Sequence, residues 1–145
     1  HPVMFFEPET VKSEAPVVVN VSSGVGSLGL AADPDGPWRE ANYPVYASSK
    51  AALNHLNAVA AVEGAPKGIR VNTLQVGSIA TEGTAGYRDA YPEQAAKVTT
   101  AVPMGRWGRP EEIAAGIAFL VSAPASFVAG AVLAVDGALS VQFPY

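Results

Sequence analysis

The sequence of 145 residues contains no cysteine and only two histidines, His1 and His55. Without cysteine the chain forms neither disulfides nor thiolate nucleophiles, a composition typical of a reducing compartment. A histidine-based zinc site or a Ser-His-Asp triad would have to depend on His55, because His1 is terminal. We therefore expect no disulfide framework and no metal centre.

Basic residues and long apolar runs are also scarce. Nine lysines and arginines stand against thirteen acidic residues, which gives a formal net charge of -4. The basic residues are scattered, so the chain lacks the patch that nucleic acids or anionic membranes attract. No apolar run approaches the roughly 18 residues of a membrane span, and the N-terminus lacks the charged and apolar segments of a secretion signal. The sequence predicts a soluble, cytoplasmic protein.

What the chain does contain is enough apolar material, 49% of its residues, for a packed core. Three short runs rich in β-branched residues predict strands, at 16–22, 68–76 and 130–136. Three other segments predict helices, at 43–66, 91–102 and 110–123. Strands that alternate with helices favour an α/β fold with a parallel sheet and right-handed crossovers.

Apolar residues recur at helical spacing in two of these segments. In the first they are Leu53, Leu56, Val59 and Ala60, which suit a long helix that ends near Gly64 and Pro66. In the helix that begins at Pro110 they are Ile113, Ile117 and Leu120, which share one face. We assign this second set to the core.

Three glycines, Gly24, Gly26 and Gly29, have the spacing G-x-G-x-x-G directly after the first predicted strand. In a dinucleotide-binding fold the third glycine opens a helix, whose N-terminus holds the pyrophosphate. Here the chain continues with turn signals around Pro34 and Pro37, and helical spacing of apolar residues does not resume until well past them. We therefore interpret these glycines as serving another purpose than pyrophosphate binding.

A sheet of three parallel strands poses a physical problem at its edges. One edge is the very apolar run from Val17 to Val21, and an exposed edge of this kind attracts a partner strand. Either another chain pairs there, or these residues are the C-terminal part of a larger doubly wound domain. Residues 1–15 have no clear period and stay unassigned.

The motif "YASSK" places Tyr46 and Lys50 four residues apart. On a helix they are separated by about 40°, so both side chains leave the same face. A neighbouring ammonium group lowers the pKa of a phenol, which would let Tyr46 exchange a proton with a carbonyl or alcohol oxygen. Ser22 and Ser23 lie at the C-terminal end of a strand, where parallel sheets bind ligands.

Five motifs in this order, "NVSSGVG", "YASSK", "IRVNTLQVGSIAT", "GRWGRPEEIA" and "GAVLAVDGA", resemble the C-terminal half of a classical short-chain dehydrogenase/reductase. The resemblance covers residues 16–138. It implies a doubly wound, Rossmann-like domain whose catalytic half is formed by residues 16–145, with the N-terminal cofactor-binding half absent from this chain. Cofactor choice, NAD or NADP, would be made in that absent half.

The same resemblance implies roles for individual residues. Ser23 orients the substrate oxygen, Tyr46 is the catalytic acid and base, and Lys50 holds the nicotinamide ribose while it lowers the tyrosine pKa. The segment "VGSIAT" lines the cofactor. Its Gly77 and Ile79 lie near the nicotinamide, and Thr81 reaches the amide or the phosphates.

The sequence also departs from the family pattern. Val76 replaces the proline of the "PG" motif, and Ala138 replaces the second glycine of "DGG". The interval from Ser23 to Tyr46 is longer than in the shortest members, and we interpret its extra segment 32–43 as an insertion that borders the active site. The family's catalytic asparagine would precede Val17 and has no counterpart here.

These observations predict an NAD(P)-dependent oxidoreductase that interconverts a small-molecule carbonyl and an alcohol, and that forms homo-oligomers or pairs with the missing half. The alternative is a non-catalytic remnant, which keeps the fold through a partner but binds no dinucleotide. Plainer explanations stay open for single residues: the two serines ending a strand, Thr81 as a loop hydroxyl, and packing roles for Trp38 and Trp107. His55 lies opposite Tyr46 on the helix and is assigned no role.

Overall fold

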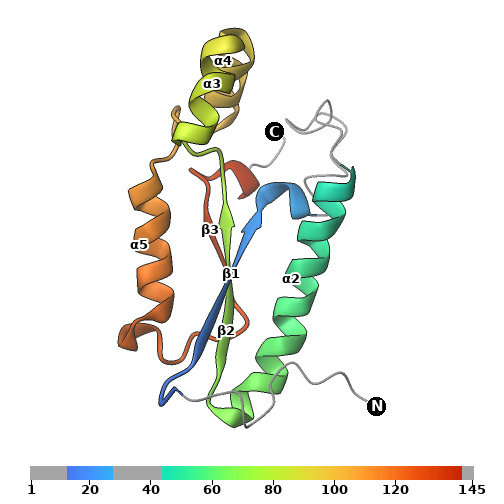
Figure 1. Cartoon of the computed structure of the whole chain (residues 1–145), viewed down its shortest axis with the longest axis vertical. Helices are drawn as coiled ribbons and strands as arrows, with labels where there is room; N and C mark the ends of the chain where they lie inside the picture. The colour runs from blue at the N-terminus through green and yellow to red at the C-terminus, as the bar shows by residue number, and fades with distance from the viewer. Residues whose placement is uncertain (1–12, 28–43, 142–145) are drawn as a thin grey trace.

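The computed structural model describes residues 13–27 and 44–141 (Figure 1). Its strands are β1 (Val17–Ser23), β2 (Arg70–Val76) and β3 (Val132–Val135). Its helices are α2 (Pro44–Gly64), α3 (Glu82–Ala90), α4 (Pro92–Ala101) and α5 (Pro110–Val121). Short 3₁₀ turns complete the described elements: η1 (Gly24–Gly26), η2 (Ala65–Lys67), η3 (Ala123–Ala125) and η4 (Leu139–Val141).

The three strands form one parallel sheet in the order β1-β2-β3, which confirms the predicted α/β class. Val17 pairs with Arg70, and the register continues to the end of β1, while Thr73 pairs with Val132 at the start of β3. Within the described residues β1 and β3 are the two edge strands. The edge predicted to need a partner is therefore an edge of this sheet.

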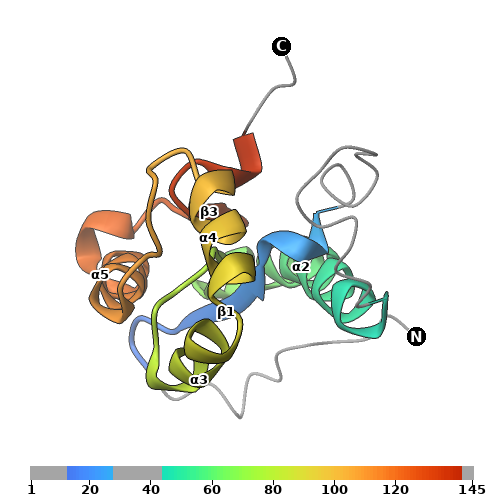
Figure 2. The ribbon, with the colours of Figure 1, turned by 90° about the horizontal axis from the view of Figure 1, so that it is seen from above.

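Helices cover both faces of the sheet. Figures 1 and 2 show α2 on one side of the strands and α5 on the other. Between α2 and the sheet lies a cluster to which α2 contributes Ala60 and Ala61. Ile69 and Val71 complete it, and Val18 packs against it. Under α5, Leu74 and Leu120 are almost completely buried, and an added Cβ at Gly116 would lie 2.8 Å from Leu74 Cδ1. The core therefore consists of two thin layers that share β2.

The buried face of α2 consists of small and polar side chains. Asn57 and Ala60 are buried, whereas Leu56 and Val59 are 44% and 43% exposed. Small side chains let the helix approach the strands closely, and Asn57 accepts a hydrogen bond from Asn20 Nδ2 at 3.3 Å. The apolar spacing identified the helix correctly, and the structure shows which side of it is buried.

Two short helices, α3 and α4, lie beyond the carboxyl ends of the strands (Figure 1). The sequence analysis predicted α4 but missed α3. Trp107 contacts both helices. Its indole nitrogen donates to Thr99 Oγ1 of α4 at 3.1 Å, and its ring centroid lies 5.6 Å from the guanidinium carbon of Arg88 in α3. These contacts agree with the packing explanation that the sequence left open.

Several expectations fall on residues outside the described ranges: Gly29, Trp38, the segment 32–43 and residues 1–12. Within the described part of the chain, no helix is long and apolar enough to cross a membrane. The same described residues include no group of three His, Cys, Asp or Glu side chains arranged to hold a metal ion.

Candidate functional site

The carboxyl ends of β1 and β2 and the first turns of α2 meet at one end of the sheet (Figure 1). This follows from the topology, because the helix that connects two parallel strands runs antiparallel to both. Ser23 ends β1, Gly77 follows β2, and Tyr46 and Lys50 lie in the first part of α2. The structure therefore brings the predicted substrate and cofactor residues to the same end of the sheet.

Lys50 connects the helix to the strand. Its ammonium group donates a hydrogen bond to the backbone oxygen of Val21 at 3.0 Å and lies 5.6 Å from the centroid of the Tyr46 ring. The predicted shared face of Tyr46 and Lys50 is thereby confirmed. The Tyr46 side chain remains accessible, with 47% of its surface exposed.

The packing of the turn η1 explains why one glycine of the G-x-G-x-x-G spacing, Gly26, is required. A Cβ atom at Gly26 would lie 2.8 Å from both the carbonyl carbon and the Cβ of Lys50, and 3.0 Å from Ala51 N. These distances are shorter than any ordinary contact, so only glycine lets η1 pack directly on α2 at this point. Gly26 therefore has a packing role between η1 and α2.

The two serines at the end of β1 have different environments. Ser22 is 3% exposed, and its hydroxyl has no hydrogen-bond partner among the described residues. Ser23 is half-buried and lines a small cavity of about 30 Å³ together with Gly77, Asp136 and Ser140. Ser23 is therefore the more accessible of the two, and its role toward a substrate stays a prediction.

The turn after β2 is packed tightly on the end of β3. Gly77 donates to the backbone oxygen of Val135 at 3.1 Å, and a Cβ there would lie 2.6 Å from Asp136 Cα. Glycine is thus the part of the family's "PG" motif that the packing requires, and it is retained. Val76 in place of proline leaves this contact intact.

Thr81 caps the helix that follows. Its side-chain oxygen accepts from the backbone nitrogen of Thr84 at 3.2 Å, and in return the Thr84 hydroxyl oxygen accepts from the backbone nitrogen of Thr81 at 2.9 Å. The Thr84 hydroxyl also donates to the backbone oxygen of Ile79 at 2.9 Å. This reciprocal capping box begins α3 and fixes the path of the chain between Ile79 and Thr84. The sequence analysis missed Thr84, although the spacing T-x-x-T after a strand is a recognisable helix start. The cofactor role of Thr81 stays a prediction.

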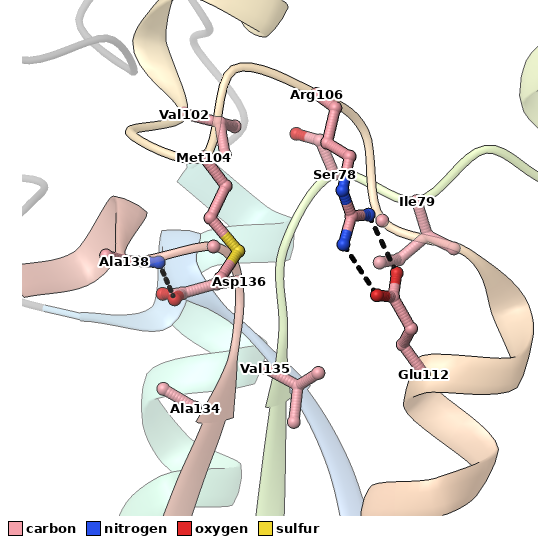
Figure 3. Close-up of a pocket in the computed structure, with 12 residues that line it drawn as sticks. Ser78, Ile79, Val102, Met104, Arg106, Glu112, Ala134, Val135, Asp136 and Ala138 are labelled. Atoms are coloured by element: carbon pink, nitrogen blue, oxygen red, sulfur yellow. Dashed lines mark hydrogen bonds and ion pairs between the residues drawn. The ribbon is translucent and has the colours of Figure 1, made fainter.

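A larger cavity of about 330 Å³ lies on the other side of this loop (Figure 3). Its walls are largely apolar and include Ile79 and Met104, while Arg106, Glu112 and Asp136 contribute charged groups. Neither Tyr46 nor Lys50 nor Ser23 lines it. The cavity therefore adjoins the predicted cofactor loop without belonging to the Tyr46 site.

Two of these charged groups form a bidentate ion pair that was not predicted from the sequence. Arg106 Nη1 and Nη2 donate to the two carboxylate oxygens of Glu112 at 2.9 and 2.6 Å (Figure 3). The hydrogen bonds from Arg106 and from the backbone of Arg109 lower the pKa of Glu112 to about 2. Both residues lie in the quoted motif "GRWGRPEEIA", but their spacing of six residues has no regular secondary-structure meaning.

Most of the chain is similar to known proteins. The family model described as enoyl-(acyl carrier protein) reductase matches residues 36–140. The galactitol 2-dehydrogenase (L-tagatose-forming) of Cereibacter sphaeroides is 47% identical over 96 residues, which cover 66% of this chain and 37% of that protein.

Solved structures give the same picture. A gluconate 5-dehydrogenase from Burkholderia cenocepacia in complex with NADP and tartrate has a TM-score of 0.72 at 30% identity, covering 88% of this chain and 46% of that one. A 4-hydroxyisoleucine dehydrogenase complexed with NADH has a TM-score of 0.74 at 29% identity, covering 89% and 49%. The chain spans less than half the length of each of these relatives. Its fold, its ordered motifs and the match to the family model establish that the chain belongs to the short-chain dehydrogenase/reductase family.

Proposed function

We propose that this chain is the catalytic half of an NAD(P)-dependent oxidoreductase that interconverts a carbonyl and an alcohol. One observation carries the proposal: the Lys50 ammonium is held by Val21 O at 3.0 Å and lies 5.6 Å from the Tyr46 ring, at the ligand-binding end of a parallel sheet. Dehydrogenase relatives solved with NADP or NADH support the cofactor class.

Tyr46 moves the proton in this proposal. The Tyr46 hydroxyl gives a proton to the carbonyl oxygen during reduction and takes it back during oxidation. The positive charge of Lys50 favours the phenolate form, and Ser23 donates a hydrogen bond to the same substrate oxygen. The exposure of Tyr46 and the half-buried position of Ser23 leave both side chains accessible to a ligand.

The residues present fit the nicotinamide end of the cofactor. A lysine ammonium has three N–H donors, and among the described residues Lys50 uses one of them, on Val21 O, so two are available for the hydroxyls of a ribose. Gly77, Ile79 and Thr81 would line the nicotinamide ring and its amide. When bound, the nicotinamide supplies or accepts the hydride.

The non-catalytic remnant remains the second candidate. It is favoured by the exposed apolar side chains of Leu56 and Val59 on α2, which suit a surface covered by a partner. In that case the fold would serve association, and the Tyr46 and Lys50 pair would be left over from a catalytic ancestor.

A cofactor titration distinguishes the two candidates. We expect saturable fluorescence changes with NADH or NADPH when a dinucleotide-binding half is present in the same polypeptide or in trans. Lys50→Ala should weaken this binding, whereas His55→Ala, an exposed change on the same helix, should not. Absence of saturable binding of both cofactors under these conditions would contradict the oxidoreductase proposal.

A further inference from the structure

Glu112 gathers four interactions at the start of α5. Its carboxylate accepts both hydrogen bonds of the Arg106 guanidinium group, at 2.9 and 2.6 Å, and a third from the backbone nitrogen of Arg109 at 2.7 Å. The guanidinium of Arg109 approaches it at 3.6 Å. One side chain thus holds both ends of the short segment 106–109. Figure 3 shows the ion pair at the Arg106 end.

The segment 106–109 is in turn hydrogen-bonded to the loop that follows β2. Gly108 N donates to Ser78 O and Ala80 N donates to Gly108 O, both at 2.9 Å, which makes a one-residue parallel bridge across Ile79. The two segments are also in steric contact, because a Cβ at Gly108 would lie 2.6 Å from Ile79 Cδ1. The position of Ile79 therefore depends on where Gly108 is held.

The ion pair is better suited to orient these segments than to stabilise the fold. The side chains of Arg106 and Glu112 are 48% and 29% exposed, and ion pairs so close to solvent add little to the free energy of unfolding. Bidentate geometry, however, defines direction as well as distance. What the pair determines is the path of residues 106–109.

We propose that Arg106 and Glu112 are positioning residues of the reaction, which hold Gly108 against residues 78–80 and so place Ile79 for the nicotinamide ring. This inference rests on the proposed function, in which Ile79 lines that ring. The pair touches neither substrate nor cofactor itself. Its loss should therefore affect the nicotinamide end of the cofactor and leave the ADP-ribose end alone.

Glu112→Gln tests this proposal, with Glu111→Gln as the matched control. Both substitutions remove one negative charge from the first turn of α5, but Glu111 makes no ion pair among the described residues. A first measurement is amide hydrogen exchange. In Glu112→Gln we expect exchange at Ala80 and Gly108 to become about tenfold faster, with α5 and β2 unchanged, and we expect no change in Glu111→Gln.

A second measurement compares NADH with ADP-ribose, which lacks the nicotinamide, on the protein with its cofactor-binding half in the same polypeptide or in trans. In Glu112→Gln the Kd of NADH should rise about fivefold or more while that of ADP-ribose changes less than about twofold. A merely structural role would weaken both ligands together. Should Glu112→Gln fail to fold, Arg106→Lys replaces it, because lysine keeps the charge and loses the bidentate fork.

The outcomes separate this inference from the proposed function. Unchanged exchange at Ala80 and Gly108, or equal weakening of NADH and ADP-ribose, overturns the positioning role and leaves the proposed function standing. Failure of the unmodified protein to bind NADH or NADPH contradicts the proposed function, while the exchange measurement still decides whether the ion pair holds the loop.

Discussion

Gly26 lies directly against Lys50: a Cβ atom at Gly26 would be 2.8 Å from the Cβ of Lys50. Gly26 and Lys50 belong to different elements, η1 and α2. Two non-bonded carbon atoms do not approach to 2.8 Å, so a side chain at position 26 would push the two elements apart. Because Lys50 also donates to Val21 O, the lysine is held from two sides. The glycine after β1 therefore helps to set the position of the proposed catalytic lysine.

Gly26→Ala should displace α2 at Lys50. Gly26 has no positive φ, so alanine is allowed by the backbone and the effect isolates the contact. We expect a loss of about 1–3 kcal/mol in the free energy of unfolding, the usual cost of overpacking, together with weaker cofactor binding. Gly86→Ala in α3 is the control, since nothing lies within 4 Å of its added Cβ. Urea unfolding that shows no loss for Gly26→Ala would refute the contact.

Tyr46→Phe should separate chemistry from binding. Removal of the proposed acid and base should lower kcat by about 100- to 10,000-fold, while the Kd of the cofactor stays within about twofold. Lys50→Ala should impair both quantities, because the lysine is proposed to hold the ribose as well. Steady-state kinetics and a fluorescence titration measure the two effects. A kcat of Tyr46→Phe within about tenfold of the unmodified enzyme would remove the tyrosine from its role.

Ala138→Gly should stabilise the fold. Ala138 has a φ of 70°, in the left-handed region where a Cβ costs roughly 1–2 kcal/mol. Glycine removes that strain but loses more chain entropy on folding, so we expect a net gain of about 0.5–1 kcal/mol. Gly68→Ala is the reverse test, because Gly68 has a φ of 73° with open space around it and should be destabilised. Calorimetry that finds Ala138→Gly less stable would contradict the strain.

The ion pair of Glu112 and Arg106 should give a defined pH dependence. The pKa of Glu112 is about 2 in the folded chain, below its ordinary value of 4.5. The contribution of its carboxylate to stability is therefore present above about pH 4.5 and disappears as the pH falls toward 2. The difference in unfolding free energy between the unmodified protein and Glu112→Gln is small, because the pair lies close to solvent, and it should disappear over this range. A difference that is constant from pH 6 to pH 2 would show that the carboxylate charge is not responsible.

The chain by itself should associate. Val21 is 48% exposed on β1, which is an edge strand among the described residues, and Leu56, Val59 and Val62 expose apolar surface on α2. Edges and patches of this kind drive pairing, either with a second copy or with a dinucleotide-binding half. Light scattering on the intact 145-residue chain measures its state. A monodisperse, cooperatively folding monomer of 14.9 kDa would defeat this prediction.

Local sequence alone determined the strands, the helices α2, α4 and α5, and the shared face of Tyr46 and Lys50. Each of these depends on residues within a few positions of one another, through β-branched runs, helix start signals and the spacing of four. The order of five motifs then identified the family. The helix α3 was missed because its start signal, the Thr81 and Thr84 capping box, is short and its residues are mostly polar.

Only the tertiary structure decided which side of α2 is buried, why Gly26 and Gly77 must be glycines, and that Glu112 holds the segment beside Ile79. These properties arise between residues that are distant in the sequence. The close approach of two backbones and the direction of a guanidinium group depend on how two elements pack. They therefore produce no periodic pattern in the sequence. The sequence could therefore name the residues of the site, whereas the packing around them determined how they are held.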